Sequence, residues 1–98
     1  MKTALPAPTK AEERRFIAIK LDVGCIACWL DHGLYTPCEI HHLLDTGRRR
    51  GHSESIGLCH PHHQGVNGIH RAKRAFRERY GTDDELLALT NKRIAELT

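Results

Sequence analysis

The sequence contains few aromatic residues and no long hydrophobic run. Aromatic side chains make up 5% of its 98 residues, and no apolar stretch approaches the length of a membrane-spanning helix. Residues 1–8 lack the apolar segment of a signal peptide, so we expect a disordered tail there and a single domain over residues 9–98. These absences predict a cytoplasmic protein with no membrane association.

A domain of this size buries a modest fraction of its surface, and it often needs a disulfide, a metal ion or a partner to be stable. Four cysteines, Cys25, Cys28, Cys38 and Cys59, could supply such a link. In a reducing compartment, a Cys-x2-Cys motif accompanied by eight histidines indicates metal binding rather than a disulfide. We therefore expect a metal-stabilised fold.

Helices are predicted near both ends of the chain. The capping boxes Thr9-x-x-Glu12 and Thr82-x-x-Glu85 mark two helix starts, because each pair of side chains can bond exposed backbone amides. The first box opens a helix over about residues 10–21. Apolar residues at helical spacing predict another helix over about residues 69–80.

The middle of the chain has the character of a hairpin followed by a helix. Short strands are predicted at residues 38–41 and 55–58, and the loop of residues 45–53 between them is rich in glycine and arginine. Pro61 suits the first turn of a brief helix. The predicted fold class is α+β, a small zinc-stapled ββα-metal core with flanking helices.

Two pairs of potential ligands have the spacing of one tetrahedral metal site. They are Cys25-x2-Cys28 and Cys59-x2-His62, and zinc accepts such mixed sulfur and nitrogen ligands. A bound ion would tie the first pair to the helix that follows the hairpin. Cys38 has two interpretations: it replaces His62 as the fourth ligand, or, as we favour, it is a small buried side chain outside the site.

A second group of histidines lies where the first strand ends and the helix begins. If His41 and His63 hold a divalent cation that polarises a phosphate, His42 is left to activate water as a base. Consecutive side chains on a regular strand point to opposite faces. Both neighbours can therefore serve one cleft only if the strand ends or distorts there.

These motifs carry a resemblance to a known family. With Glu39-Ile40-His41-His42 and Leu58-Cys59-His60-Pro61-His62-His63, the chain resembles the HNH (His-Me finger) endonucleases. Matches through residues 47–52, 62–65 and 76–81 make it similar to the RecA-dependent nuclease family of the phage recombination-enhancement nuclease Ref. The similarity covers about residues 22 to 90.

The resemblance implies a metal-dependent DNA endonuclease that hydrolyses phosphodiester bonds in phage recombination or DNA processing. It implies His42 as the general base, and His41 and His63 as ligands of a catalytic Mg²⁺ or Mn²⁺, with Zn²⁺ as a further candidate. The cysteine and histidine pairs would hold a structural Zn²⁺. DNA and a RecA recombinase filament would be the partners, in a bacterial cell that hosts the phage or prophage.

Two positions depart from the family pattern. The asparagine that gives HNH its middle letter has no obvious match, and His52 is the nearest candidate for orienting the base. His70 is a candidate third ligand of the catalytic ion, although Gly65 and Gly68 interrupt the helical spacing that would pair it with His63.

The charge distribution suggests where DNA would bind. The formal net charge of +3 is too weak to identify a partner, but positive charge is concentrated in the middle of the sequence. Such residues contact phosphates without sequence preference, or form a solvated surface. The candidates for DNA binding are Arg48, Arg49, Arg50, Arg71, Arg74 and Arg77. The alternative function is a non-catalytic, zinc-stabilised DNA-binding or adaptor module.

Overall fold

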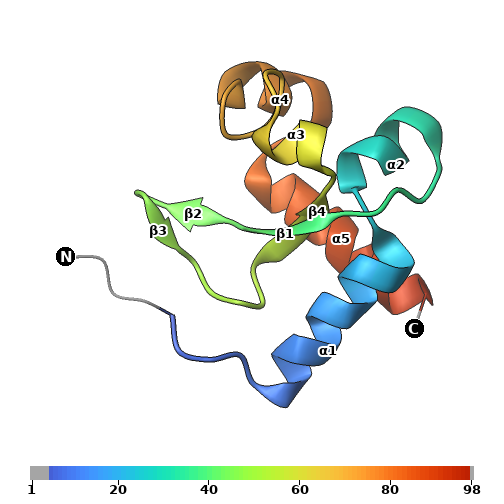
Figure 1. The fold of residues 1–98 in the computed structure, drawn as a ribbon, viewed down its shortest axis with the longest axis vertical. Coiled ribbons are helices and arrows are strands. Elements are labelled where there is room, and N and C mark those ends of the chain that lie inside the picture. The colour runs from blue at the N-terminus through green and yellow to red at the C-terminus, as the bar shows by residue number, and fades with distance from the viewer. Residues whose placement is uncertain (1–4, 98) are drawn as a thin grey trace.

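A computed structural model describes residues 5–97 as a small α+β protein. It combines helices with two short antiparallel ladders, as Figure 1 shows. The α+β prediction is therefore confirmed. Residues 1–4 of the predicted tail lie outside the described residues, whereas residues 5–8 carry neither helix nor strand.

The first helix begins at its predicted cap. In α1, Lys10–Ala18, the Thr9 hydroxyl accepts from the Glu12 amide at 3.2 Å and the Glu12 carboxylate accepts from the Thr9 amide at 2.8 Å. The predicted helix then continues as a π-helical turn, η1, Ile19–Val23. Gly24 ends it with a φ of 72°, a conformation that glycine adopts without steric cost.

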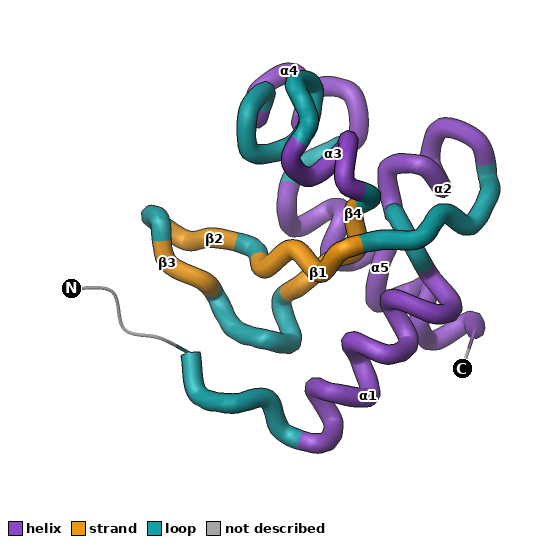
Figure 2. Tube along the Cα trace, in the orientation of Figure 1, coloured by secondary structure: helices purple, strands orange, loops and turns teal. Residues whose placement is uncertain are grey.

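Two strands form the central ladder. β1, Glu39–His42, pairs antiparallel with β4, Ser55–Leu58, and the last pair in the ladder joins His42 to Ser55. The predicted loop beyond it contains a second ladder of β2, Leu44–Asp45, and β3, Arg48–Arg49, which projects away from the helices in Figure 2. The hairpin is therefore more regular than the sequence suggested.

The segment after β4 differs from its prediction. α3, His60–Gln64, follows β4 as expected, but the helix predicted from residue 69 begins later, as α4, Lys73–Tyr80. The amide of Ile69 donates to the His62 carbonyl at 2.8 Å, so this backbone folds back onto α3 instead of starting a helix.

Two further helices complete the core. α2, Ile26–His32, and α5, Asp83–Leu97, pack against β4, and α5 passes behind the strands in Figure 1. Their apolar residues join those of the strands in one buried cluster, which includes Val23, Ile26, Leu43, Ile56, Leu58, Phe76 and Leu86. Within residues 5–97, no helix combines the length and the apolar character needed to cross a membrane.

Candidate metal centres and active site

The predicted cysteine and histidine ligands lie together. Cys25 caps α2 with Cys28 in the first turn, and Cys59 caps α3 with His62 one turn later. Residues three apart share a face of a helix start, so each pair points the same way. The four ligand atoms all lie within 4.8 Å of one another.

The spacing of these atoms fits a zinc ion. Zinc bonds of about 2.3 Å to sulfur in a tetrahedron give sulfur–sulfur separations of roughly 3.8 Å. The Sγ atoms of Cys28 and Cys59 are 3.8 Å apart, and the sulfurs of Cys25, Cys28 and Cys59 lie 3.1 to 3.6 Å from Nδ1 of His62. The cluster could therefore hold a structural zinc.

Cys38 lies outside this cluster. Its Sγ is 3.7 Å from the carbonyl oxygen of Ile19, at the packed junction of η1 with the strands. Burial raises the pKa of its thiol to about 11, which keeps it a neutral, small side chain. This geometry supports the interpretation in which His62, not Cys38, completes the ligand set.

Burial makes the cysteine cluster dependent on a cation. Desolvation raises the pKa of Cys25 to about 12 and also raises the pKa of Cys59. Metal ligation requires thiolates, and a nearby cation is what stabilises a thiolate against such burial.

A chain of hydrogen bonds fixes the orientation of His62. Its Nε2 is 3.1 Å from the Tyr80 hydroxyl, which donates to Asp31 Oδ2 at 2.7 Å, and Arg79 donates to Asp31 Oδ1 at 3.1 Å. Because the hydroxyl proton goes to Asp31, the Tyr80 oxygen accepts from Nε2–H. The lone pair of Nδ1 then faces the three sulfurs.

A second cluster contains three histidines. Nε2 of His63 lies 3.1 Å from Nδ1 of His41 and 3.0 Å from Nε2 of His70. Cis positions of an octahedral ion with bonds of about 2.1 Å are separated by roughly 3.0 Å, so these nitrogens could share one ion. The fold-back after α3 brings His70 to His63, which helical spacing did not predict.

The surroundings of this cluster leave lone pairs on its ring nitrogens that could bind a metal ion. Burial lowers the pKa of His41 to about 3, so its ring is neutral. Nδ1 of His63 is 2.8 Å from Oε1 of Glu39, which fixes the proton on Nδ1 and leaves Nε2 as an acceptor. Sequence reasoning missed Glu39 in this role, although strand alternation places it on the same face as His41.

His42 and His52 form a separate pair. Nε2 of His42 is 3.0 Å from Nδ1 of His52, and Nε2 of His52 is 2.6 Å from the carbonyl oxygen of Pro6. A carbonyl only accepts, so neutral His52 donates from Nε2 and accepts on Nδ1 from His42. Nδ1 of His42 then carries a lone pair with no hydrogen-bond partner within residues 5–97.

The two neighbouring histidines therefore have different surroundings. The His41 ring lies 5.0 Å from that of His63, whereas the His42 ring lies 5.8 Å from that of Phe16 on α1. This is the alternation expected of a strand. The strand ends at His42.

The predicted DNA-binding arginines differ in whether they form ion pairs with carboxylates of the protein. Arg50 pairs with Glu54 at 2.8 Å and with Asp84 at 2.9 Å, which joins the hairpin to α5. Arg74 pairs with Glu78, and Arg77 pairs with Asp83, each at 3.3 Å. Of the six, those exposed without such a pair in the described part of the chain are Arg48, Arg49 and Arg71.

The fold and these clusters define a small α+β protein with two groups of side chains that could each hold a metal ion. The chain belongs to the family described as "Recombination enhancement, RecA-dependent nuclease", whose model matches residues 8–95. The resemblance to the RecA-dependent nuclease family is thereby confirmed, and the family name supports a nuclease role in recombination. No curated protein and no solved structure matches the chain.

Proposed function

We propose that the protein is an HNH-type, metal-dependent endonuclease that hydrolyses phosphodiester bonds of DNA. The observation that carries the proposal is the convergence of three imidazole nitrogens, from His41, His63 and His70, beside a strand end that carries His42. Membership of a family of RecA-dependent nucleases supports it.

His41, His63 and His70 would hold the catalytic ion. When bound, a divalent cation would polarise the phosphate and stabilise the leaving oxygen. Imidazole ligands suit zinc and other transition ions better than Mg²⁺, so the donor set favours Zn²⁺ among the candidate metals over Mg²⁺ and Mn²⁺. The cysteine cluster would hold a separate, structural zinc.

His42 is the proposed base. Burial, reinforced by the nearby charge of Arg49, lowers the pKa of His42, so its ring is neutral near pH 7. His52 and the Pro6 carbonyl would orient it. As a water oxygen bonds to phosphorus, the water's proton passes to Nδ1 of His42, the phosphorus–oxygen ester bond breaks, and the leaving oxygen takes a proton from solvent.

The exposed arginines would position the substrate. Arg48 and Arg49 project on the β2–β3 hairpin, and Arg71 lies on the turn before α4. Contacts of this kind add affinity without sequence preference. We place the reaction in phage or prophage recombination in the bacterial cytoplasm, with DNA and a RecA filament as partners.

A plasmid assay tests this function. Supercoiled plasmid is incubated with the protein and Mg²⁺, Mn²⁺ or Zn²⁺, with and without a RecA filament, beside His42→Ala. We expect the parent to nick the plasmid and His42→Ala to lose at least about 100-fold in rate, because general-base catalysis contributes on that scale. The zinc content and circular dichroism of the variant should match those of the parent.

The matched control is His32→Ala, an exposed histidine at the end of α2, which should cut like the parent. Binding of DNA by parent and His42→Ala with cleavage by neither would contradict the nuclease and favour the zinc-stabilised DNA-binding or adaptor module. Unfolding of His42→Ala would instead identify His42 as a structural residue.

A further inference from the structure

A hollow of about 180 Å³ opens beside the three-histidine cluster. His41 and His70 form part of its wall, together with the apolar side chains of Leu44 and Ile69. The first residues of two helices, Lys73 of α4 and Asp83 of α5, complete its lining. A group bound in this hollow would lie next to the candidate catalytic ion.

Lys73 supplies positive charge to this hollow. It lies in the wall of the hollow together with His41 and His70, so its ammonium is near both rings. Its side chain has no ion pair or hydrogen bond within residues 5–97. The ammonium is therefore available to a ligand.

The other cations of α4 are engaged by protein carboxylates. Arg77 donates to Oδ2 of Asp83 at 3.3 Å, and so it offsets the one carboxylate that lines the hollow. Arg74 and Arg79 pair with Glu78 and Asp31. Asp83 keeps one buried oxygen, Oδ1, without a hydrogen-bond partner, and in the described part of the chain its ion pair is with Arg77 and not with Lys73.

We propose that the hollow is the seat of the scissile phosphodiester, with Nζ of Lys73 donating to a non-bridging phosphate oxygen. Lysine binds phosphate as a mobile point charge, and Leu44 and Ile69 offer an apolar surface for the adjoining sugar. The inference rests on the proposed nuclease function and extends it to a substrate contact that the arginine-centred sequence analysis missed.

The test compares Lys73→Gln and Lys73→Arg in the full chain, with Lys92→Gln, an exposed lysine of α5, as the matched control. Binding of a short fluorescent DNA duplex is measured by anisotropy over a range of salt concentrations, without added divalent ion. For Lys73→Gln we expect weaker binding and a salt slope smaller by about 0.9, the value for one phosphate contact. Lys73→Arg and Lys92→Gln should bind like the parent.

A calorimetric titration with Ni²⁺, an ion that imidazole binds well, separates a phosphate contact from a structural role. Removing a cation beside His41 and His70 reduces its repulsion of the ion, so Lys73→Gln should bind Ni²⁺ as tightly as the parent or several-fold more tightly. A structural lysine would instead weaken the binding of DNA and Ni²⁺ together. That result, or unchanged DNA binding, would overturn the inference.

Cleavage provides the last arm. In the plasmid assay we expect Lys73→Gln to lose at least about tenfold in kcat, since a donor aimed at the reacting phosphate acts mainly in the transition state. If the parent cuts and Lys73→Gln cuts equally well, the phosphate seat is wrong while the nuclease stands. If the parent fails to cut the plasmid with any of the three metals, the proposed nuclease function is wrong. The DNA-binding and Ni²⁺ measurements then still decide whether Lys73 contacts phosphate.

Discussion

Neighbouring histidines on α3 offer different ring nitrogens to the two clusters. Tyr80 bonds Nε2 of His62, so Nδ1 faces the sulfurs, whereas Glu39 bonds Nδ1 of His63, so Nε2 faces the other histidines. The nitrogen that is free to bind a metal is set by the hydrogen bond made by the other one. One residue step along a short helix thus separates the two candidate metal sites.

Tyr80→Phe tests this hydrogen bond at the zinc cluster. Loss of the hydroxyl removes the partner of His62, and changes of this kind cost about 10- to 100-fold in metal affinity. We expect weaker zinc binding in competition with a chromogenic chelator. Tyr35→Phe is the control, because its hydroxyl donates to the Lys20 carbonyl, away from the cluster. Equal zinc affinity in the parent and Tyr80→Phe would show that the hydroxyl does not support His62.

Helix α3 depends on its contacts rather than on its own length. It has five residues, far fewer than an isolated helix needs to be stable in water. A zinc ion bound by the cysteine cluster would tie it to α2 through Cys59 and His62, and His63 lies beside His41 of β1. The zinc cluster therefore also positions a ligand of the proposed catalytic ion.

Cys25→Ser should remove the zinc and unfold part of this arrangement. Bound zinc contributes directly to folding free energy, so we expect the Tm to fall by at least about 10 °C and the zinc content to drop by about one ion per chain. Cys38→Ser, outside the cluster, is the matched control and should keep its zinc. A chelator should lower the Tm of the parent but leave that of Cys25→Ser nearly unchanged; equal Tm values for parent and Cys25→Ser would contradict a structural zinc.

The sequence predicted the features that depend on residues close to one another in the chain. The capping box at Thr9, the strand pair and the two cysteine pairs all follow from spacing within a few residues. The approach of His70 to His63 does not, because it depends on backbone bonds between the segment of residues 65–70 and α3. The contact of Tyr80 with His62 likewise depends on how α4 packs, which helical periodicity leaves open.

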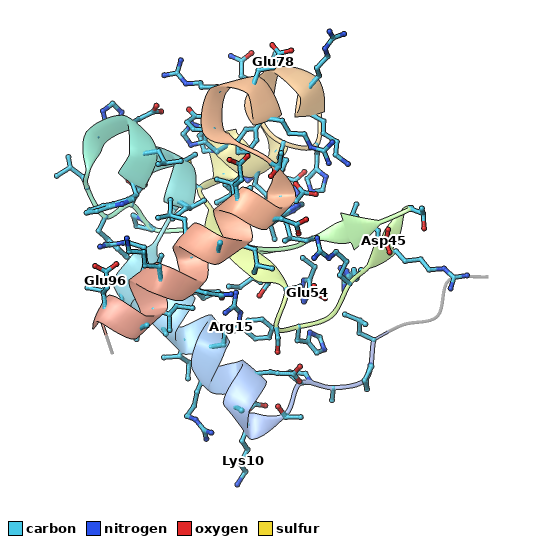
Figure 3. All side chains as sticks on the ribbon, turned by 180° about the vertical axis from the view of Figure 1, so that it is seen from behind. Lys10, Arg15, Asp45, Glu54, Glu78 and Glu96 are labelled. Carbon is cyan, nitrogen blue, oxygen red and sulfur yellow. The ribbon has the colours of Figure 1, made fainter. Side chains whose placement is uncertain are left out.

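At the scale of the whole molecule, one arginine joins three elements. Arg15 of α1 donates to the Ser55 carbonyl of β4 at 2.5 Å and to Asn91 of α5 at 2.7 Å, and Figure 3 shows it where α1 and α5 meet the strands. Arg15 is only partly exposed at this junction. It lies one turn before the buried Ile19, a spacing that already placed it on the inner face.

Arg15→Ala should destabilise the whole fold. Burial partly desolvates the guanidinium of Arg15 and thereby lowers its pKa. Its hydrogen bonds to Ser55 and Asn91 offset the cost of this desolvation. Without it the buried Ser55 loses a donor, and we expect a loss of about 1–3 kcal/mol in the free energy of unfolding, measured by urea denaturation. Arg14→Ala, at the exposed neighbouring position, should stay within about 0.5 kcal/mol of the parent. If both variants match the parent, water replaces the guanidinium at no cost, and the apolar cluster alone holds α1 against the strands and α5.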